Sequence, residues 1–299
     1  MVEYFNMWAI LSISAALLWS VVNIIDKYVL SKWIREPLVV IIIISFIGLI
    51  ASGGVYFIYE FQPISYFNIL LALLAGVFHF FCYILYFKAL KIEEVSRVVP
   101  LFYLSPLFIL FLAAIFLGEV FTPSKYLGIL LLVIGAILIS LKNLSKISFG
   151  RAFYLMVLSA FTLAINSVLV KYLLGFTDYW TIFAYERIGA AIGSIPIIYL
   201  YLPRLIDIIR EHGKRVIAIL SVAEFLNLLA LLLITIATSI GFVTLVNALS
   251  SIQPFFVLVL AVILSTFYPF FLKEEIGKSV ILLKLSAILL MFIGAVLIT

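Results

Sequence analysis

An acid and a base, Glu186 and Arg187, stand side by side in the otherwise apolar stretch IFAYERIGAAIG, residues 182–193. A guanidinium presents a planar fork of donors that suits a carboxylate, so Arg187 could bind a carboxylate group of a ligand. An acid held within an apolar run is typical of proton relays, which gives Glu186 the chemistry of a proton carrier. Two plainer interpretations stay open: a structural ion pair that fixes neighbouring helices, and a Glu186 side chain that reaches outward to water.

Each of these two charges is expected to have its own partner on another helix, because adjacent helical positions point about 100° apart. For Arg187 the sequence offers Glu224, which lies at a comparable depth in the next apolar run. For Glu186 it offers Lys171, nearer the end of the preceding run. Glu224 is itself a second candidate proton carrier.

Other polar and aromatic side chains fall at corresponding depths of the apolar runs, where they could line a ligand cavity. The polar candidates are His79, Asn227, Asn23, Asn166, Asn247 and Gln253, and the aromatic candidates are Trp19 and Tyr83. His79 could carry a proton or be a core residue among phenylalanines, and the amides could join helices by hydrogen bonds. Lys27 and Lys171 recur near run ends, where lysine normally reaches the headgroups, although their recurrence also fits gating or substrate binding.

The composition requires an apolar environment for most of the chain's surface. Of the 299 residues, 67% are hydrophobic and 11% are charged, against about 25% charged residues in soluble domains. The single cysteine, Cys82, excludes an internal disulfide framework, and the two histidines show no HExxH spacing. No nucleotide-binding glycine motif or GxSxG is present, and acids and histidine do not cluster as an intramembrane enzyme would need. We therefore expect no enzyme, no cofactor and no metal.

The elements that must position these residues are apolar runs long enough to cross a bilayer as helices, which takes about 20 residues. The runs are 7–29, 38–59, 66–90, 96–118, 124–141, 152–174, 179–202, 216–238, 242–267 and 280–298. The start MVEYFNMW lacks the basic region of a signal peptide, so the first run is read as a retained helix. The pattern predicts an all-α integral membrane protein with ten transmembrane helices and no soluble domain.

Basic residues indicate the orientation of these helices. Most of the 19 Lys and Arg lie in or beside the odd-numbered connections. The positive-inside rule therefore places those connections in the cytoplasm and both termini outside the cell membrane. The basic balance reflects this topology and calls for no nucleic-acid partner.

The two halves of the chain resemble each other. NIIDKYVL (23–30) matches SVLVKYLL (167–174), YLSPLFILFLAAI (103–115) matches SIQPFFVLVLAVI (251–263), and LLVIGAILIS (131–140) matches the end of the chain. The growing offset indicates an insertion around 265–279. Because each half, 1–144 and 145–299, holds five runs, the second must enter the membrane from the opposite side. Inverted repeats of this kind are typical of secondary transporters, with the substrate held near the midplane.

Proline and glycine mark places where helices bend or approach closely. Pro100, Pro106 and Pro254 interrupt the fourth and ninth runs, as hinges or as static kinks. Gly189 and Gly193 form a GxxxG pattern that permits close helix contact. The fifth and tenth runs hold glycine but almost no polar residue, so they are expected to serve packing or a homodimer.

The stretches AALLWSVVNIIDKY and ALKIEEVSRVVPLFYLSPLFILFLAAIFLGEVFTPSKYLGILLLVIGAILIS, with their second-half copy, resemble the EamA-like family of the drug/metabolite transporter superfamily. The resemblance implies ten helices, a central cavity, and export of amino acids or similar metabolites. Three features depart from the family: the second half lacks LGE, the second run lacks a basic residue, and many members keep their termini inside.

The sequence thus predicts a secondary transporter that exports small organic metabolites by alternating access, driven by protons or by the substrate's own gradient. Its partners would be the small-molecule substrate, the lipid bilayer and protons as coupling ion. The alternatives are an extruder of lipophilic cations in which Glu224 is the essential charge, and a membrane scaffold that transports nothing.

Overall fold

Apolar runs of about twenty residues become the long helices of the fold. The structure, a computed structural model, describes residues 2–34, 36–59, 62–117, 122–140, 150–240 and 250–298, and these residues contain no strand. The helices are α1 (Val2–Lys32), α2 (Pro37–Ile58), α3 (Tyr66–Ile92), α4 (Val95–Val98), the 3₁₀ helix η1 (Val99–Leu104), α5 (Ser105–Leu117), α6 (Pro123–Ser140), α7 (Arg151–Leu173), α8 (Tyr179–His212), α9 (Arg215–Ile240), α11 (Gln253–Phe267) and α12 (Lys278–Ile298).

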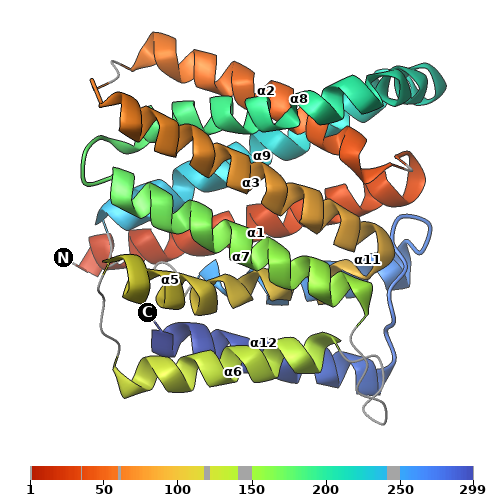
Figure 1. The fold of residues 1–299 in the computed structure, drawn as a ribbon. Coiled ribbons are helices and arrows are strands. Elements are labelled where there is room, and N and C mark those ends of the chain that lie inside the picture. Colours follow the sequence, from red (N-terminus) through yellow and green to blue (C-terminus); the bar gives the residue numbers. More distant parts are fainter. Residues whose placement is uncertain are drawn as a thin grey trace.

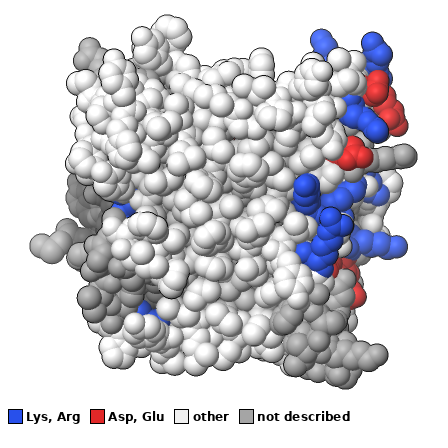
Figure 2. Space-filling model, in the orientation of Figure 1, with Lys and Arg blue, Asp and Glu red and all other residues white. Residues whose placement is uncertain are grey.

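The helices lie side by side along one direction, and both chain ends lie at the same end of the bundle (Figure 1). The visible surface between the two ends is uncharged, and its Lys, Arg, Asp and Glu gather mainly at the end away from the termini (Figure 2). Within the described ranges, seven helices are long and apolar enough to cross a membrane, and α6, α11 and 95–109 are shorter apolar helices. The chain is therefore a multi-pass membrane protein, as its composition predicts. We call the charged end the basic end.

The fourth predicted run is broken into three pieces. It begins as α4, tightens into η1 and continues as α5. Pro100 stands in the first turn of η1, where its missing N–H cannot support an α-helical hydrogen bond. Pro254 likewise occupies the first turn of α11, so it opens this helix, whereas the sequence placed it inside the run.

Helix α8 is longer than its sequence indicates. Asp178 caps its N-terminus by accepting hydrogen bonds from the backbone N–H groups of Trp180 (2.8 Å) and Thr181 (3.0 Å). Burial by itself would raise the pKa of Asp178, but the Thr181 hydroxyl and these N–H groups lower it. The helix then continues through Pro203 to His212, beyond the predicted end at 202. Gly213, with φ of 69°, ends it.

Helices pack in pairs that each join the first half of the chain to the second. The main contacts are α1 with α9, α2 with α8, α3 with α7 and α8, and α6 with α12. Glycine permits the closest of them: a Cβ at Gly189 would lie 2.1 Å from the Leu73 carbonyl oxygen, and one at Gly76 would lie 2.0 Å from that of Glu186. Gly135 and Gly294 likewise permit the close approach of α6 and α12. The packing role predicted for Gly189 and for the glycines of the fifth and tenth runs is confirmed, and Gly76 adds a close contact that was not predicted.

Candidate functional site

The crossing of α3 and α8 brings Glu186 into contact with His79. His79 Nδ1 lies 2.6 Å from Glu186 Oε1, and the Asn166 side-chain amide of α7 donates to the same oxygen at 2.8 Å. Asn166 also donates to the Ala75 carbonyl at 3.0 Å. Glu186 is therefore held by groups from three helices. The predicted Glu186–Lys171 pair is wrong, because Lys171 lies exposed near the end of α7.

Arg187 is buried beside this contact, with few partners of its own. Its Nη2 lies 3.9 Å from Glu186 Oε1 and 3.5 Å from His79 Nδ1. If Nδ1 donates its proton to Glu186, it cannot also accept one from Arg187, so the latter contact is electrostatic only. The guanidinium carbon lies 5.2 Å from the centre of the Phe183 ring. Arg187 Nε is buried and has no hydrogen-bond partner among the described residues.

Glu224 on α9 has an incompletely satisfied acceptor, as Arg187 has an incompletely satisfied donor. Its Oε2 accepts a hydrogen bond from Asn227 Nδ2 at 3.3 Å, and Asn227 Oδ1 in turn accepts one from Trp19 Nε1 at 3.0 Å. Its Oε1 is buried and, in the described part of the chain, unpartnered. The predicted direct pair with Arg187 does not form within 4 Å among these residues. A buried donor and a buried acceptor of opposite charge are thus both incompletely satisfied.

A second polar chain runs from α1 to α11 and η1. Gln253 Nε2 donates to Asn23 Oδ1 at 2.7 Å, and Asn23 Nδ2 donates to the Tyr86 hydroxyl at 2.9 Å. Tyr86 donates to Asp26 Oδ2 at 3.3 Å, and Tyr103 donates to Gln253 Oε1 at 3.1 Å. The predicted candidates Asn23 and Gln253 are therefore hydrogen-bonded to each other. Tyr86 and Tyr103, which were not predicted, extend this network.

Asp26 is the most important residue that the sequence reading missed. It is only 5% exposed and directly precedes Lys27, whose place near a run end indicated a position close to the membrane surface. An acid within an apolar run is nevertheless the sequence feature by which Asp26 could have been predicted as a core residue. Its burial beside Tyr86 adds a third carboxyl group to the core, after Glu186 and Glu224.

The remaining candidates lie at the margins of this network or outside it. Tyr83 stacks on His79 with ring centroids 5.0 Å apart. Lys27 Nζ donates to the carbonyls of Leu90 and Glu93, both at 2.6 Å, so it caps the end of α3 near the basic end, as cations do at helix C-termini. Asn247 lies outside the described residues. No group of three His, Cys, Asp or Glu that could hold a metal occurs in the described ranges.

A separate cluster of ion pairs, largely buried except for Glu275, lies at the basic end. Lys284 of α12, fully buried, contacts Glu94 Oε2 at 2.7 Å and Glu274 Oε2 at 3.3 Å. Arg97 contacts Glu94 Oε2 and Glu275 Oε2, both at 3.0 Å. These pairs fix the loop 268–277, where the sequence indicated an insertion, against α4 and α12. We call these five residues the loop cluster.

The two acids that bind Lys284 have pKa values shifted in opposite directions. Burial raises the pKa of Glu94, but hydrogen bonds from Lys284, the Glu275 N–H and Arg97, together with the charge of Lys284, bring it below its ordinary value. Burial and the nearby charge of Glu94 raise the pKa of Glu274, and Lys284 with the Ser96 hydrogen bonds does not reverse that rise. The fold thus favours the charged form of Glu94 and disfavours that of Glu274.

Fold and network together define a multi-pass helical membrane protein with a polar core. Residues 6–141 match the model of the EamA-like transporter family. The match confirms the predicted resemblance over those residues, which make up 136 of the 299.

Two further comparisons bear on the fold and the family. A solved structure titled "Crystal structure of protein" is 16% identical, with a TM-score of 0.53 over 98% of this chain and 96% of that chain. At that identity the likeness concerns the fold alone. No curated protein matches the chain.

Proposed function

We propose that the protein is a secondary transporter that exports small organic metabolites bearing a carboxylate, such as amino acids, across the cell membrane by alternating access. Residues 1–144 and 145–299 form two inverted repeats, and the substrate binds between them in the polar core. Protons couple to transport through the buried carboxyl groups Glu224 and Glu186. The EamA-like match of residues 6–141 supports the transporter class.

The pairing of helices supports the repeat. Exchanging the halves maps α1, α2, α3, α5 and α6 onto α7, α8, α9, α11 and α12. The contact of α1 with α9 then becomes the contact of α7 with α3, and that of α5 with α7 becomes that of α11 with α1; all four occur. The contacts of α2 with α8 and of α6 with α12 map onto themselves. This is the pattern expected of a two-fold pseudosymmetry.

The observation that carries the substrate class is the pair of unsatisfied buried atoms, Arg187 Nε and Glu224 Oε1. Leaving a buried charged group without a partner costs several kcal/mol. A ligand carboxylate on Arg187 and a ligand ammonium or a proton on Glu224 would remove that cost. Substrate binding thus completes a network that the protein alone leaves open.

The first experiment measures the thermal stability of the purified chain across a panel of carboxylates, amino acids and amines. A ligand that binds only the folded state raises stability, by about 2.7 kcal/mol at a hundredfold excess over Kd. We expect amino acids or other carboxylates to stabilise the protein, and Arg187→Gln to abolish the effect. Arg204→Gln is the matched control, because Arg204 lies exposed on the same helix.

Other outcomes decide between the alternatives. Stabilisation by amines that lack a carboxylate, unchanged in Arg187→Gln, would indicate an extruder of lipophilic cations that uses Glu224. If no compound stabilises the protein and no labelled substrate enters proteoliposomes, the result would favour a membrane scaffold that transports nothing.

A further inference from the structure

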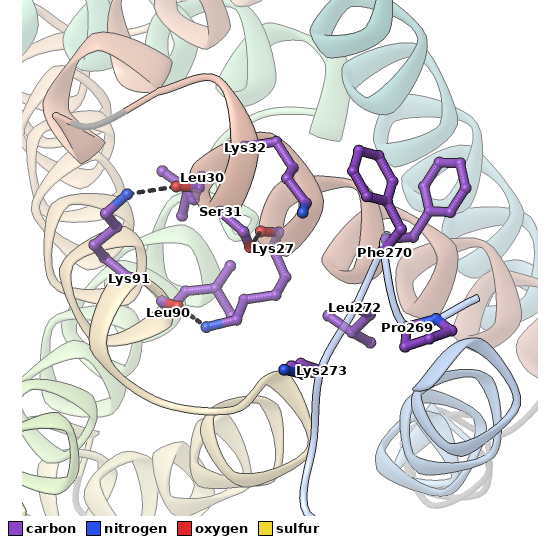
Figure 3. Close-up of a pocket in the computed structure, with 11 residues that line it drawn as sticks. Lys27, Leu30, Ser31, Lys32, Leu90, Lys91, Pro269, Phe270, Leu272 and Lys273 are labelled. Carbon is purple, nitrogen blue, oxygen red and sulfur yellow. Dashed lines mark hydrogen bonds between the residues drawn. The ribbon is translucent and has the colours of Figure 1, made fainter. Parts of the chain in front are cut away.

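A pocket of about 380 Å³ opens at the basic end, between the last turns of α1 and α3 and the loop 268–277 (Figure 3). This volume lies within the range of small-ligand sites. Four lysines line it, namely Lys27, Lys32, Lys91 and Lys273, and its lining contains no Asp or Glu. The pocket is separate from the polar core, because none of its lining residues belongs to the hydrogen-bond networks of Glu186, Glu224 or Gln253.

Two of the four lysines carry charges that the described residues leave unpaired. Lys32 and Lys273 are exposed and make no hydrogen bond or ion pair with any described residue, and Lys32 Nζ lies 4.1 Å from the centre of the Phe270 ring. Lys27 interacts with Glu93, Glu94 and Glu274 at longer range, but Glu94 and Glu274 are already engaged by Lys284. The mouth of the pocket therefore presents positive charge.

The wall of the pocket is preformed. Leu272 is 3% exposed, and Phe271 packs on Tyr28 with ring centroids 5.1 Å apart. The loop cluster holds the next two residues, Glu274 and Glu275, through Lys284 and Arg97. A ligand would thus meet a loop wall that is in place before it binds, which reduces the entropy cost of binding.

The rim is apolar and aromatic. Phe270 is 70% exposed and Tyr268 57% exposed, both on the loop that forms the wall. Exposed aromatic side chains next to cations at the end of a membrane helix are typical of the level of the lipid headgroups. A soluble anion would make no use of this rim, whereas a lipid offers a phosphate and an acyl chain together.

We propose that this pocket binds a phosphate-bearing anion, the headgroup of an acidic phospholipid in the leaflet at the basic end. Phosphate oxygens accept charge-assisted hydrogen bonds from the ammonium groups, and basic pockets between membrane helices bind such headgroups. Lys32 and Lys273 contact the phosphate at the mouth, and the acyl chains lie along Phe270.

The test is native mass spectrometry of the purified full chain titrated with dioleoyl phosphatidylglycerol and, separately, with dioleoyl phosphatidylcholine. Wild type should bind phosphatidylglycerol more tightly. The double variant Lys32→Gln/Lys273→Gln should weaken that binding by about tenfold to thirtyfold, since each lysine near an anionic lipid surface contributes about 1 kcal/mol. Lys214→Gln/Lys278→Gln is the control, because it removes the same charge from exposed positions of the same end outside the pocket.

Three results would overturn the proposal. Equal weakening in both double variants would show general attraction to a basic surface, and equal binding of the two lipids would show that the net negative charge of the headgroup is not recognised. Displacement of phosphatidylglycerol by sn-glycerol 3-phosphate, with the same dependence on Lys32 and Lys273, would assign the pocket to a soluble phosphate compound in place of a lipid.

Discussion

At the scale of single residues, the contact of His79 with Glu186 determines how the core tolerates a buried carboxylate. We expect His79→Phe to lower the free energy of unfolding by about 3 kcal/mol, because the buried Glu186 carboxylate loses its shortest contact and keeps only Asn166 and the more distant Arg187. Phenylalanine keeps the ring that stacks on Tyr83, so the loss reports the charge contact. The measurement is thermal or denaturant unfolding of the purified variants.

The double variant His79→Phe/Glu186→Gln provides the control for this prediction. Removing the carboxylate as well should recover part of the loss, giving a coupling of about 1–3 kcal/mol between the two sites. If the stability losses of the two single variants simply added in the double variant, the 2.6 Å contact between His79 and Glu186 would contribute no net stability.

The loop cluster gives a prediction that depends on pH. Glu94 has a folded pKa below its ordinary value, so it contributes stability above the unfolded pKa of about 4.3, and that contribution is lost as pH falls through the folded pKa. Glu274 has a raised pKa, so its contribution has the opposite sign: it is present at low pH and lost as pH rises through the folded pKa. The two acids, bound to the same lysine, should respond oppositely to acid.

Two matched variants test this difference at neutral pH. Glu94→Gln should lower the unfolding temperature, and Glu274→Gln should lower it less or raise it. Acidification from about pH 8 to about pH 4 should then cost the Glu94→Gln protein less stability than wild type. If Glu274→Gln lowered the unfolding temperature more than Glu94→Gln at neutral pH, the assigned directions of the two pKa shifts would be wrong.

At the scale of elements, the approach of α3 and α8 depends on glycine. We expect Gly189→Ala to cost about 1–3 kcal/mol, because its Cβ would lie 2.1 Å from the Leu73 carbonyl oxygen and the backbones would have to separate. The same separation would move His79 from Glu186, so any ligand-dependent stabilisation should fall too. Gly53→Ala on α2 is the control: its Cβ meets nothing within 4 Å, and alanine is the better helix former by up to about 1 kcal/mol.

The elements themselves could largely be predicted from the sequence, because in lipid a helix is the simplest way to pair backbone groups and its length is set by the bilayer. The errors fall at prolines. The predicted run 179–202 ends just before Pro203, but the helix continues to His212, and Pro254, predicted inside the ninth run, stands in the first turn of α11. Proline fits a first turn and can be tolerated within a membrane helix, so it alone does not fix a boundary.

Which side chains meet was harder to predict than which elements form. Glu186, Arg187 and His79 stand out as polar groups in apolar runs, and the structure brings them together. The pairing of Glu186 with His79 depends on the rotation of α3 against α8, which Gly76 and Gly189 set by close contact and which no spacing within one helix reveals. The loop cluster joins residues of α4 to residues far along the chain and had no local signal.

At the scale of the whole molecule, the charge asymmetry links the fold to the membrane. The termini lie at one end, and Lys and Arg gather mainly at the other (Figures 1 and 2). This arrangement agrees with the sequence prediction that the termini and the basic connections lie on opposite sides of the membrane. From the positive-inside rule we predict that the basic end faces the cytoplasm and that the termini lie outside, whereas many EamA-like proteins keep their termini inside.

Cysteine labelling in intact cells tests that orientation. Thr122 precedes α6 at the end that carries the termini, and Lys214 lies in the turn between α8 and α9 at the basic end; both are exposed. In a Cys82→Ala background, an impermeant maleimide should label Thr122→Cys in intact cells and label Lys214→Cys only after the cells are opened. The reverse pattern would place the basic end outside. Because the rule rests on the retention of Lys and Arg during insertion, that result would require another feature of the chain to set its topology. It would also move the proposed acidic-lipid pocket to the outer leaflet, without removing the lysines that form it.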